Sequence, residues 1–396
     1  MPGCRIVVAS LLRPHGPTGT QTHLRMLFDY LRATRQSADL VTPFSWLPML
    51  ALPVFGVRRV VGPLSGPLSV WWYRSWHYVF LRQAMRRALR SGQPLVVYAQ
   101  CPLSAKAALE ARVNERQRVV LIVHFNLSQA EEWVGTGHIA RDGRLYRQIE
   151  RFEADVLPRV DGIVYPSAFM QRIVQTRIAG LERIPSIISP NFVSRVPGTD
   201  RAGPSRDLIS IGTLEPRKNQ SYLLHVLAEA NRRDRRYSLT LVGHGPDRGR
   251  LEALASSLSV ESQVQFLGFQ GNAARLLNGH RVYVHSALIE NLPIVLIEAL
   301  AGGLPVLAAP VGGIPEVFSD GGEGYYWPLD DPAEGASRLI ALLEDPARYA
   351  ALAHAAVQRF EQHFETSLVA SHLHDFLCGQ VAASDPVAIG AGQRSD

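Results

Sequence analysis

Short apolar runs rich in β-branched residues alternate with longer segments of helical periodicity along this chain. This rhythm is typical of βα units, whose strands assemble into parallel sheets. In the first half of the chain the pattern predicts strands at residues 5–10, 95–99, 119–125, 162–165 and 188–189. It predicts helices at residues 20–35, 104–113, 145–156 and 168–175. We therefore expect an α/β fold in this half.

A segment dense in proline, glycine, serine and charge, residues 190–207, has the composition of a linker and leads into a second βα series. In this series, strands are predicted at residues 208–212, 239–243, 264–267, 282–284 and 305–308, and helices starting near residues 219, 247, 273, 293 and 332. We thus predict two Rossmann-like domains, residues 1–192 and 193–363, with parallel sheets that face a central cleft where ligands bind. A C-terminal helix over about residues 364–379 is predicted to pack back on the first domain, and residues 380–396 are predicted to be a disordered tail.

The composition is that of an ordinary globular protein, because 46% of the 396 residues are hydrophobic and 19% are charged. These values exclude a disordered chain and a collagen-like fibre. The three cysteines, Cys4, Cys101 and Cys378, suggest neither a metal-ligand spacing nor a disulfide framework, so we expect a reducing compartment. The charge-free residues 41–57 contain three prolines and are fewer than the roughly 20 apolar residues of a spanning helix. We expect a cytoplasmic protein, at most peripheral on the inner face of the plasma membrane.

Positive charge is concentrated in one region. Residues 41–109 contain no acidic residue but eight basic ones, namely Arg58, Arg59, Arg74, Arg82, Arg86, Arg87, Arg90 and Lys106. Residues 41–90 also hold four of the six tryptophans, and tryptophan with arginine beside an apolar helical face is typical of a helix at an anionic membrane surface. The alternative is that the tryptophans pack inside the first domain and the arginines are solvated. No recognition helix, metal knuckle or aromatic sheet motif indicates a nucleic-acid partner.

Two glutamates, Glu290 and Glu298, flank an apolar segment in the second half. Within one helix, eight residues would separate them by about 12 Å along the axis, too far for the carboxylate pair of a glycosidase at about 5–9.5 Å. If Glu290 lies on the loop before the helix, both carboxylates can face a ligand that lies across the helix N-terminus. A helix N-terminus favours binding of a phosphate, and carboxylates favour binding of hydroxyl groups. A nucleotide sugar offers both groups. The alternative is that Glu290 only interacts with the helix dipole at the N-terminus and that Glu298 is a solvated helix residue. The apolar neighbours of Glu298 disfavour it.

The surrounding sequence resembles glycosyltransferase family 4, whose members are retaining nucleotide-sugar transferases of GT-B fold. The resemblance rests on Glu290-Asn291-Leu292-Pro293, on Glu298-Ala299-Leu300 and on the glycines and proline that follow, up to Glu316. It implies a donor-binding site that includes Asn291, Leu292, Pro293 and Glu298, with Glu290 in a catalytic role.

Two further segments of the second half match the family. One is a strand, loop and helix with Gly212, Thr213, Arg217 and Lys218, where the two cations are placed to neutralise a diphosphate. Family members commonly carry an arginine where Thr213 stands, so Arg217 is interpreted as its substitute. The other segment places Gly243 and Gly245 after a strand, where the nucleotide is expected to approach the backbone.

In the first half, the loop with Gly16 and Gly19 resembles the glycine-containing loop that approaches the donor phosphate in this family. His124 follows a predicted strand and resembles the histidine that family members place beside the donor sugar. A lone histidine after an apolar strand is more often structural, but a strand's carboxyl end is where ligand contacts lie. His124 is therefore kept as a catalytic candidate with Glu290, Lys218 and Arg217.

The resemblance implies transfer of a sugar from GDP-mannose or a UDP-hexose, with retention and without a metal or other cofactor. The expected acceptor is a saccharide or lipid-linked saccharide in bacterial surface polysaccharide or lipopolysaccharide synthesis. With no second carboxylate visible as a nucleophile, a front-face route in which the leaving phosphate takes the acceptor proton is the preferred hypothesis. The alternatives are a nucleotide-sugar epimerase and a non-catalytic sugar-nucleotide sensor; a dinucleotide oxidoreductase lacks its G-x-G-x-x-G after the first strand.

Overall fold

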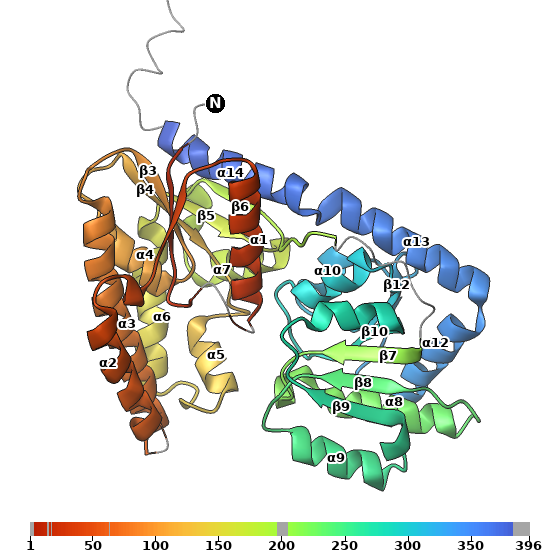
Figure 1. Cartoon of the computed structure of the whole chain (residues 1–396). Coiled ribbons are helices and arrows are strands. Elements are labelled where there is room, and N and C mark those ends of the chain that lie inside the picture. Colours follow the sequence, from red (N-terminus) through yellow and green to blue (C-terminus); the bar gives the residue numbers. More distant parts are fainter. Residues whose placement is uncertain (1–3, 14–15, 17, 63, 196–204, 383–396) are drawn as a thin grey trace, which may run out of the picture. The chain divides into compact units, whose positions relative to one another are not determined.

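The computed structural model describes residues 4–13, 16, 18–62, 64–195 and 205–382 (Figure 1). It divides into two compact units. The N-terminal unit comprises residues 1–190 and 369–396, and the C-terminal unit comprises residues 191–368. Each unit is built around one parallel sheet with helices on its faces, the arrangement expected of repeated βα units.

The sheet of the N-terminal unit has six parallel strands in the order β2-β1-β3-β4-β5-β6. The strands are β1 (Ile6–Ala9), β2 (Ala38–Val41), β3 (Leu95–Ala99), β4 (Gln117–Ile122), β5 (Gly162–Tyr165) and β6 (Ser186–Ile188). Five of them confirm the sequence prediction with ends shifted by a few residues. The exception, β2, was not predicted, because its four residues include an exposed Asp39 and do not form an apolar run.

Helices cover this sheet. They are α1 (Gly19–Ala33), α2 (Pro48–Val61), α3 (Gly66–Leu89), α4 (Pro102–Leu109), α5 (Gln129–Gly135), α6 (Arg144–Val156) and α7 (Ala168–Arg177). Because helices lie on both faces, the central strands are buried on both sides, and every residue of β1 and β3 is fully buried. This explains why these strands appear in the sequence as continuous apolar runs.

The sheet of the C-terminal unit also has six parallel strands, in the order β12-β11-β10-β7-β8-β9. They are β7 (Arg206–Ile211), β8 (Leu239–Val242), β9 (Val264–Gly268), β10 (His280–His285), β11 (Val306–Ala308) and β12 (Gly324–Tyr326). The helices are α8 (Gln220–Asn231), α9 (Arg248–Ser257), α10 (Ile294–Ala301), α11 (Ile314–Val317), α12 (Pro332–Glu344), α13 (Pro346–His363) and α14 (Thr366–Ala382). The helix predicted from residue 273 is instead a 3₁₀ segment, Ala273–Gly279.

Strand order locates the ligand-binding edge of each unit. In the N-terminal unit the chain reverses its direction of strand addition between β1 and β3, and in the C-terminal unit it does so between β7 and β10. In open parallel sheets, ligands bind outside the carboxyl ends of the two strands at such a switch point. The residues that follow these four strands are therefore where the site is sought.

Helix α14 begins in the C-terminal unit, and from Val369 onward its residues belong to the N-terminal unit. There Phe376 lies against Gly162 of β5, and Cys378 forms a disulfide bond with Cys4. The expectation of unpaired cysteines is therefore wrong, and the pairing was hidden by a sequence separation of 374 residues. The helix also includes residues 380–382 of the predicted disordered tail, while residues 383–396 lie outside the described part of the chain.

The charge-free residues 41–57 form the end of β2, a 3₁₀ turn (Pro43–Ser45) and the first part of α2. Within the described part of the chain, no helix combines the length and the apolar character needed to cross a membrane.

Candidate active site

Glu290 occupies the switch point of the C-terminal unit. It lies on the loop between β10 and α10, whereas Glu298 lies inside α10, as the sequence predicted. The Glu290 carboxylate is buried and forms an ion pair with Lys218. The His285 Nε2 atom lies 3.2 Å from Glu290 Oε1, and Arg217 Nη1 lies 3.6 Å from Glu290 Oε2. Two cations from the loop after β7 and a histidine from the end of β10 therefore converge on one carboxylate.

Backbone contacts hold these two loops together. Arg217 and Lys218 lie on a 3₁₀ turn, Pro216–Lys218, that follows β7. The Arg217 carbonyl accepts a hydrogen bond of 2.9 Å from the Leu288 N–H, and the Lys218 carbonyl accepts one of 2.9 Å from the Ser286 hydroxyl. Because the loops after β7 and β10 are tied at both cations, the positions of the cations are fixed before any ligand binds.

The charge state of the group follows from its neighbours. Burial alone raises the pKa of Glu290, but Lys218, the hydrogen bond from His285 and Arg217 outweigh burial and hold this pKa well below its usual range. Burial lowers the pKa of His285, so its ring is neutral at pH 7. With Nε2 donating to Glu290, the His285 Nδ1 atom faces the Tyr283 hydroxyl at 3.3 Å. Sequence reasoning missed His285 and Tyr283, although a histidine at the end of an apolar strand was an available signal.

Two glycines of the predicted signature support the Glu290 backbone. Gly312 has a φ of +60°, and a Cβ atom there would lie 1.8 Å from the Glu290 carbonyl oxygen. The Gly313 N–H donates a hydrogen bond of 3.0 Å to the same oxygen. A side chain at residue 312 would therefore displace the loop that carries Glu290.

The other predicted donor-site glycines have a packing role. A Cβ atom on Gly243 would lie 1.9 Å from the Gly212 carbonyl oxygen, and one on Gly245 would lie 2.1 Å from the Leu214 carbonyl oxygen. These glycines let the loops after β7 and β8 touch, which explains them without a ligand. Thr213, between these contacts, is exposed, and its carbonyl accepts a hydrogen bond from Gln220.

The remaining predicted residues surround the start of α10. Asn291, Leu292 and Pro293 are buried, and the Leu292 carbonyl accepts a 2.7 Å hydrogen bond from Asn191. Pro293 is the N-cap of α10, which begins at Ile294 and so confirms the helix predicted to start near residue 293. Glu298 is half-buried, and its charge contributes to a raised pKa of Tyr283, which burial raises most.

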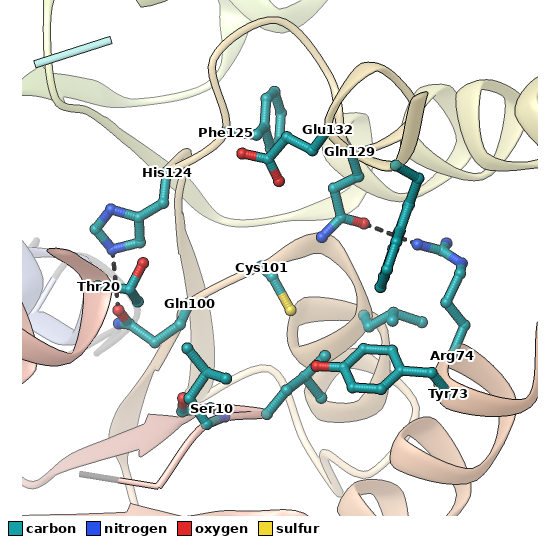
Figure 2. A pocket seen from close by; sticks show the side chains of 14 residues that line it. Ser10, Thr20, Tyr73, Arg74, Gln100, Cys101, His124, Phe125, Gln129 and Glu132 are labelled. Carbon is teal, nitrogen blue, oxygen red and sulfur yellow. Dashed lines mark hydrogen bonds between the residues drawn. The ribbon is translucent and has the colours of Figure 1, made fainter. Parts of the chain in front are cut away.

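The N-terminal unit contains a cavity of about 210 Å³ at the carboxyl ends of β1, β3 and β4 (Figure 2). His124, which follows β4, lines it, and its Nε2 atom lies 3.1 Å from Gln100 Oε1. Burial and the neighbouring His23, whose ring centroid is 5.1 Å away, lower the pKa of His124. His124 is therefore a neutral imidazole that can exchange hydrogen bonds with a ligand hydroxyl.

The opposite wall of this cavity includes Arg74 and Gln129, which Figure 2 shows joined by a hydrogen bond. The sequence allows two interpretations of the basic region, solvated arginines or a membrane surface, and both place Arg74 outside the core. Both are wrong for Arg74, because this residue is only 9% exposed. No sequence pattern distinguishes Arg74 from the other basic residues of its region.

The loop before α1 is organised by the chain itself. Thr18 caps α1 and exchanges hydrogen bonds with Gln21, and Gly19 is the first helical residue. A Cβ atom on Gly16 would lie 2.1 Å from Gln21 Oε1, so Gly16 makes room for this cap. Residues 14, 15 and 17 of the predicted phosphate loop lie outside the described part of the chain.

Comparisons with known proteins agree with the two sheets and the convergent loops. The model of the Glycosyl transferase 4-like domain matches residues 18–186, and that of Glycosyl transferases group 1 matches residues 198–359. A phosphatidyl-myo-inositol mannosyltransferase of Mycobacterium tuberculosis is 33% identical over 378 residues, which cover 90% of this chain and 92% of that protein. An N-acetyl-alpha-D-glucosaminyl L-malate synthase of Bacillus anthracis is 34% identical over 133 residues, covering 34% of this chain and 35% of that protein.

Solved structures share the fold. Sucrose-phosphate synthase from Thermosynechococcus elongatus matches with a TM-score of 0.74 at 18% identity, and the match covers 96% of this chain and 100% of the synthase. Anabaena HepE in complex with UDP and glucose matches with a TM-score of 0.68 at 17% identity, and the match covers 95% of this chain and 99% of HepE. The two parallel sheets and this likeness show that the chain has the GT-B fold. The chain belongs to glycosyltransferase family 4.

Proposed function

We propose that this enzyme transfers a hexose, such as mannose, from a nucleotide diphosphate donor to a saccharide or lipid-linked acceptor, with retention at the anomeric carbon. The observation that carries the proposal is the pairing of Glu290 with Lys218 and Arg217 at the switch point of the C-terminal unit. A relative named as a mannosyltransferase and a neighbour of the same fold that binds UDP and glucose support this choice of substrate class. GDP-mannose and UDP-hexoses are both candidate donors.

The charges of the site suit the reaction. Breaking the bond to the anomeric carbon leaves negative charge on the diphosphate, and Lys218 and Arg217 supply positive charge for it. The ionised Glu290 and the half-buried Glu298 accept hydrogen bonds from sugar hydroxyls. Asn291 and the start of α10 lie beside Glu290 and complete the donor-binding group.

We further propose that the leaving phosphate takes the acceptor proton on the same face of the sugar, so that no protein nucleophile is needed. In this scheme Lys218 and Arg217 neutralise the diphosphate, and no metal or other cofactor takes part. His124 contributes a hydrogen bond to the donor sugar from its place at the end of β4.

The test is a thermal-shift screen of nucleotide sugars, followed by assay of the selected donor with and without acceptor. A donor raises the melting temperature by mass action because it binds only the folded chain. A transferase releases nucleoside diphosphate faster when acceptor is added. An epimerase would change the sugar without releasing nucleotide, and a sensor would bind donor without turnover; either result would overturn the proposal.

An apolar surface in the N-terminal unit supports a lipid-linked acceptor. Seven of the eleven exposed large apolar side chains of the described residues lie within residues 47–79, on and around α2 and the first half of α3. Met49 is 86% exposed, Leu64 is 81% exposed and Trp71 is 50% exposed. Trp72, in contrast, donates a hydrogen bond to the Val54 carbonyl, and Trp46 packs on Phe80, so only part of the tryptophan-rich region faces solvent.

We propose that this surface lies on the anionic inner face of the plasma membrane of a bacterium, and that the enzyme acts there in surface polysaccharide or lipopolysaccharide synthesis. Exposed apolar groups next to basic ones favour such a surface, and Arg86 and Arg87 are exposed further along α3. Flotation with anionic liposomes tests this placement. The Met49→Ser/Leu64→Ser variant should lose binding, whereas Phe269→Ser, an exposed apolar residue of the C-terminal unit, should retain it. Equal binding by both variants, or no binding by the wild type, would contradict it.

A further inference from the structure

Arg74 is a buried charge in the wall of the N-terminal cavity. Its side chain extends from α3, and Nη1 donates a 3.0 Å hydrogen bond to Gln129 Oε1. The guanidinium carbon lies 5.0 Å from the centre of the Phe152 ring. These contacts fix the orientation of the guanidinium, but both partners are neutral.

No carboxylate among the described residues lies within 4.0 Å of the Arg74 guanidinium. The charge of Glu153 acts on Arg74 from a greater distance and raises its pKa, against the effect of burial. Glu153 is buried nearby, but its Oε2 atom pairs with Arg177 at 2.6 Å and its Oε1 atom accepts the Gln129 N–H at 2.8 Å. Glu132 also lines the cavity, but its side chain is exposed to solvent.

The thiol that faces the cavity does not provide the missing charge. Burial raises the pKa of Cys101, so this side chain is a neutral thiol at pH 7. Burial also lowers the pKa of Arg74, because the charged guanidinium is less stable in this buried site than in water. A buried cation without a counter-charge is costly, so an anion entering the cavity gains an interaction that the chain leaves unused.

The cavity also provides a second hydrogen-bond donor and enough room for a small anionic group. Because Gln129 Oε1 accepts from Arg74, its amide nitrogen faces the cavity, and Figure 2 shows this nitrogen pointing towards Cys101. A planar guanidinium beside an amide donor matches the oxygens of a carboxylate or phosphate. The volume of about 210 Å³ is large enough to admit a carboxylate or phosphate group.

We propose that Arg74 and Gln129 bind an oxyanion, a carboxylate or phosphate, carried by the sugar acceptor. This inference rests on the proposed function and deepens it, because it specifies the chemistry of the acceptor. The bound oxyanion holds the acceptor in the cavity whose other side is formed by His124 and Gln100. Arg74 is then a specificity-determining residue for the acceptor and has no role in binding the donor.

The test compares thermal melts of the full chain in inorganic phosphate, in succinate and in chloride of the same ionic strength. The wild type and Arg86→Met, which removes an exposed charge from the same helix, should melt higher in at least one oxyanion. Arg74→Met should lose this shift, with a dissociation constant at least about tenfold weaker. Arg74→Lys, which keeps the charge without the planar fork, should fall between them. The absence of a shift in the wild type, or equal shifts in Arg74→Met, would overturn the proposal.

Two further measurements identify the source of the oxyanion and separate this proposal from the proposed function. Vesicles of phosphatidylcholine with and without phosphatidylinositol report a lipid phosphate, whereas succinate reports a soluble carboxylate. In turnover assays, Arg74→Met should raise the KM for the acceptor and leave the KM for the donor unchanged. If no nucleotide sugar binds or reacts, the proposed function fails while anion binding through Arg74 still stands. If turnover is normal and Arg74→Met keeps its acceptor KM, only the acceptor proposal fails.

Discussion

Lys218 and Glu290 form a buried ion pair although they lie 72 residues apart in the sequence, on the loops after β7 and β10. The pair crosses the position at which the strand order of the sheet reverses. Lys218 holds one carboxylate oxygen of Glu290, which His285 also contacts, and Arg217 lies near the other oxygen.

The first prediction concerns this pair. Lys218→Met and Glu290→Gln should each lower turnover at least about tenfold, because charge stabilisation at the diphosphate and the contact with the sugar are lost. Each single change also removes the main counter-charge of a buried or partly buried group, which should lower the free energy of unfolding by up to about 3 kcal/mol. Glu290 keeps its contacts with His285 and Arg217 in Lys218→Met. The double variant should recover stability without activity. Steady-state kinetics and urea unfolding measure the two effects.

Glu252→Gln, which breaks the exposed pair with Arg248 on α9, is the control for removing a carboxylate from the same unit. It should leave both turnover and stability close to the wild-type values. Wild-type turnover in Lys218→Met or Glu290→Gln would refute their assignment to the site.

Gly312→Ala should reduce both stability and turnover. The new Cβ atom would collide with the Glu290 carbonyl oxygen, and the positive φ is unfavourable for alanine, so a loss of about 1–3 kcal/mol is expected. Gly249→Ala, in an open position on α9, should instead be neutral or stabilise by up to about 1 kcal/mol. Unfolding curves of the two variants provide the comparison. Equal stability of the two would show that the loop carrying Glu290 adjusts freely.

Stability should fall as the pH decreases from about 6.5 to 4. Burial lowers the pKa of His23 from 6.5 to about 4, so in this window the unfolded chain takes up a proton that the folded chain does not. Above pH 6.5 the buried His23 does not reduce the free energy of unfolding. Near pH 4 it reduces this free energy by about 3 kcal/mol. Urea unfolding across this range should give a flatter profile for His23→Gln than for the wild type, and parallel profiles above pH 7. Identical slopes below pH 6.5 would contradict the buried neutral state of His23.

The disulfide predicts a specific thiol count. Denatured without reductant, the chain should expose one reactive thiol, that of Cys101, and after reduction it should expose three. Reduction, or the Cys4→Ser/Cys378→Ser variant, should destabilise the N-terminal unit by about 2–4 kcal/mol. The variant itself should not respond further to reductant. Three thiols in the untreated denatured protein would show that the bond is absent.

The fold was predictable because its strands are buried on both faces and therefore appear as apolar runs in the sequence. The loops of Glu290 and Lys218 were predictable for the same reason, since they directly follow such runs. Arg74 and His285 were not, because their importance comes from burial and from neighbours far along the chain. The donor-binding role of Gly243 and Gly245 stays a prediction, and the structure adds a backbone packing role that sequence alone does not reveal.

The bond between Cys4 and Cys378 closes nearly the whole polypeptide into a covalent ring. A protease that cuts the backbone once, anywhere between these residues, therefore opens the ring without separating its pieces. Both fragments would migrate together on a non-reducing gel and part only when a thiol reagent is added.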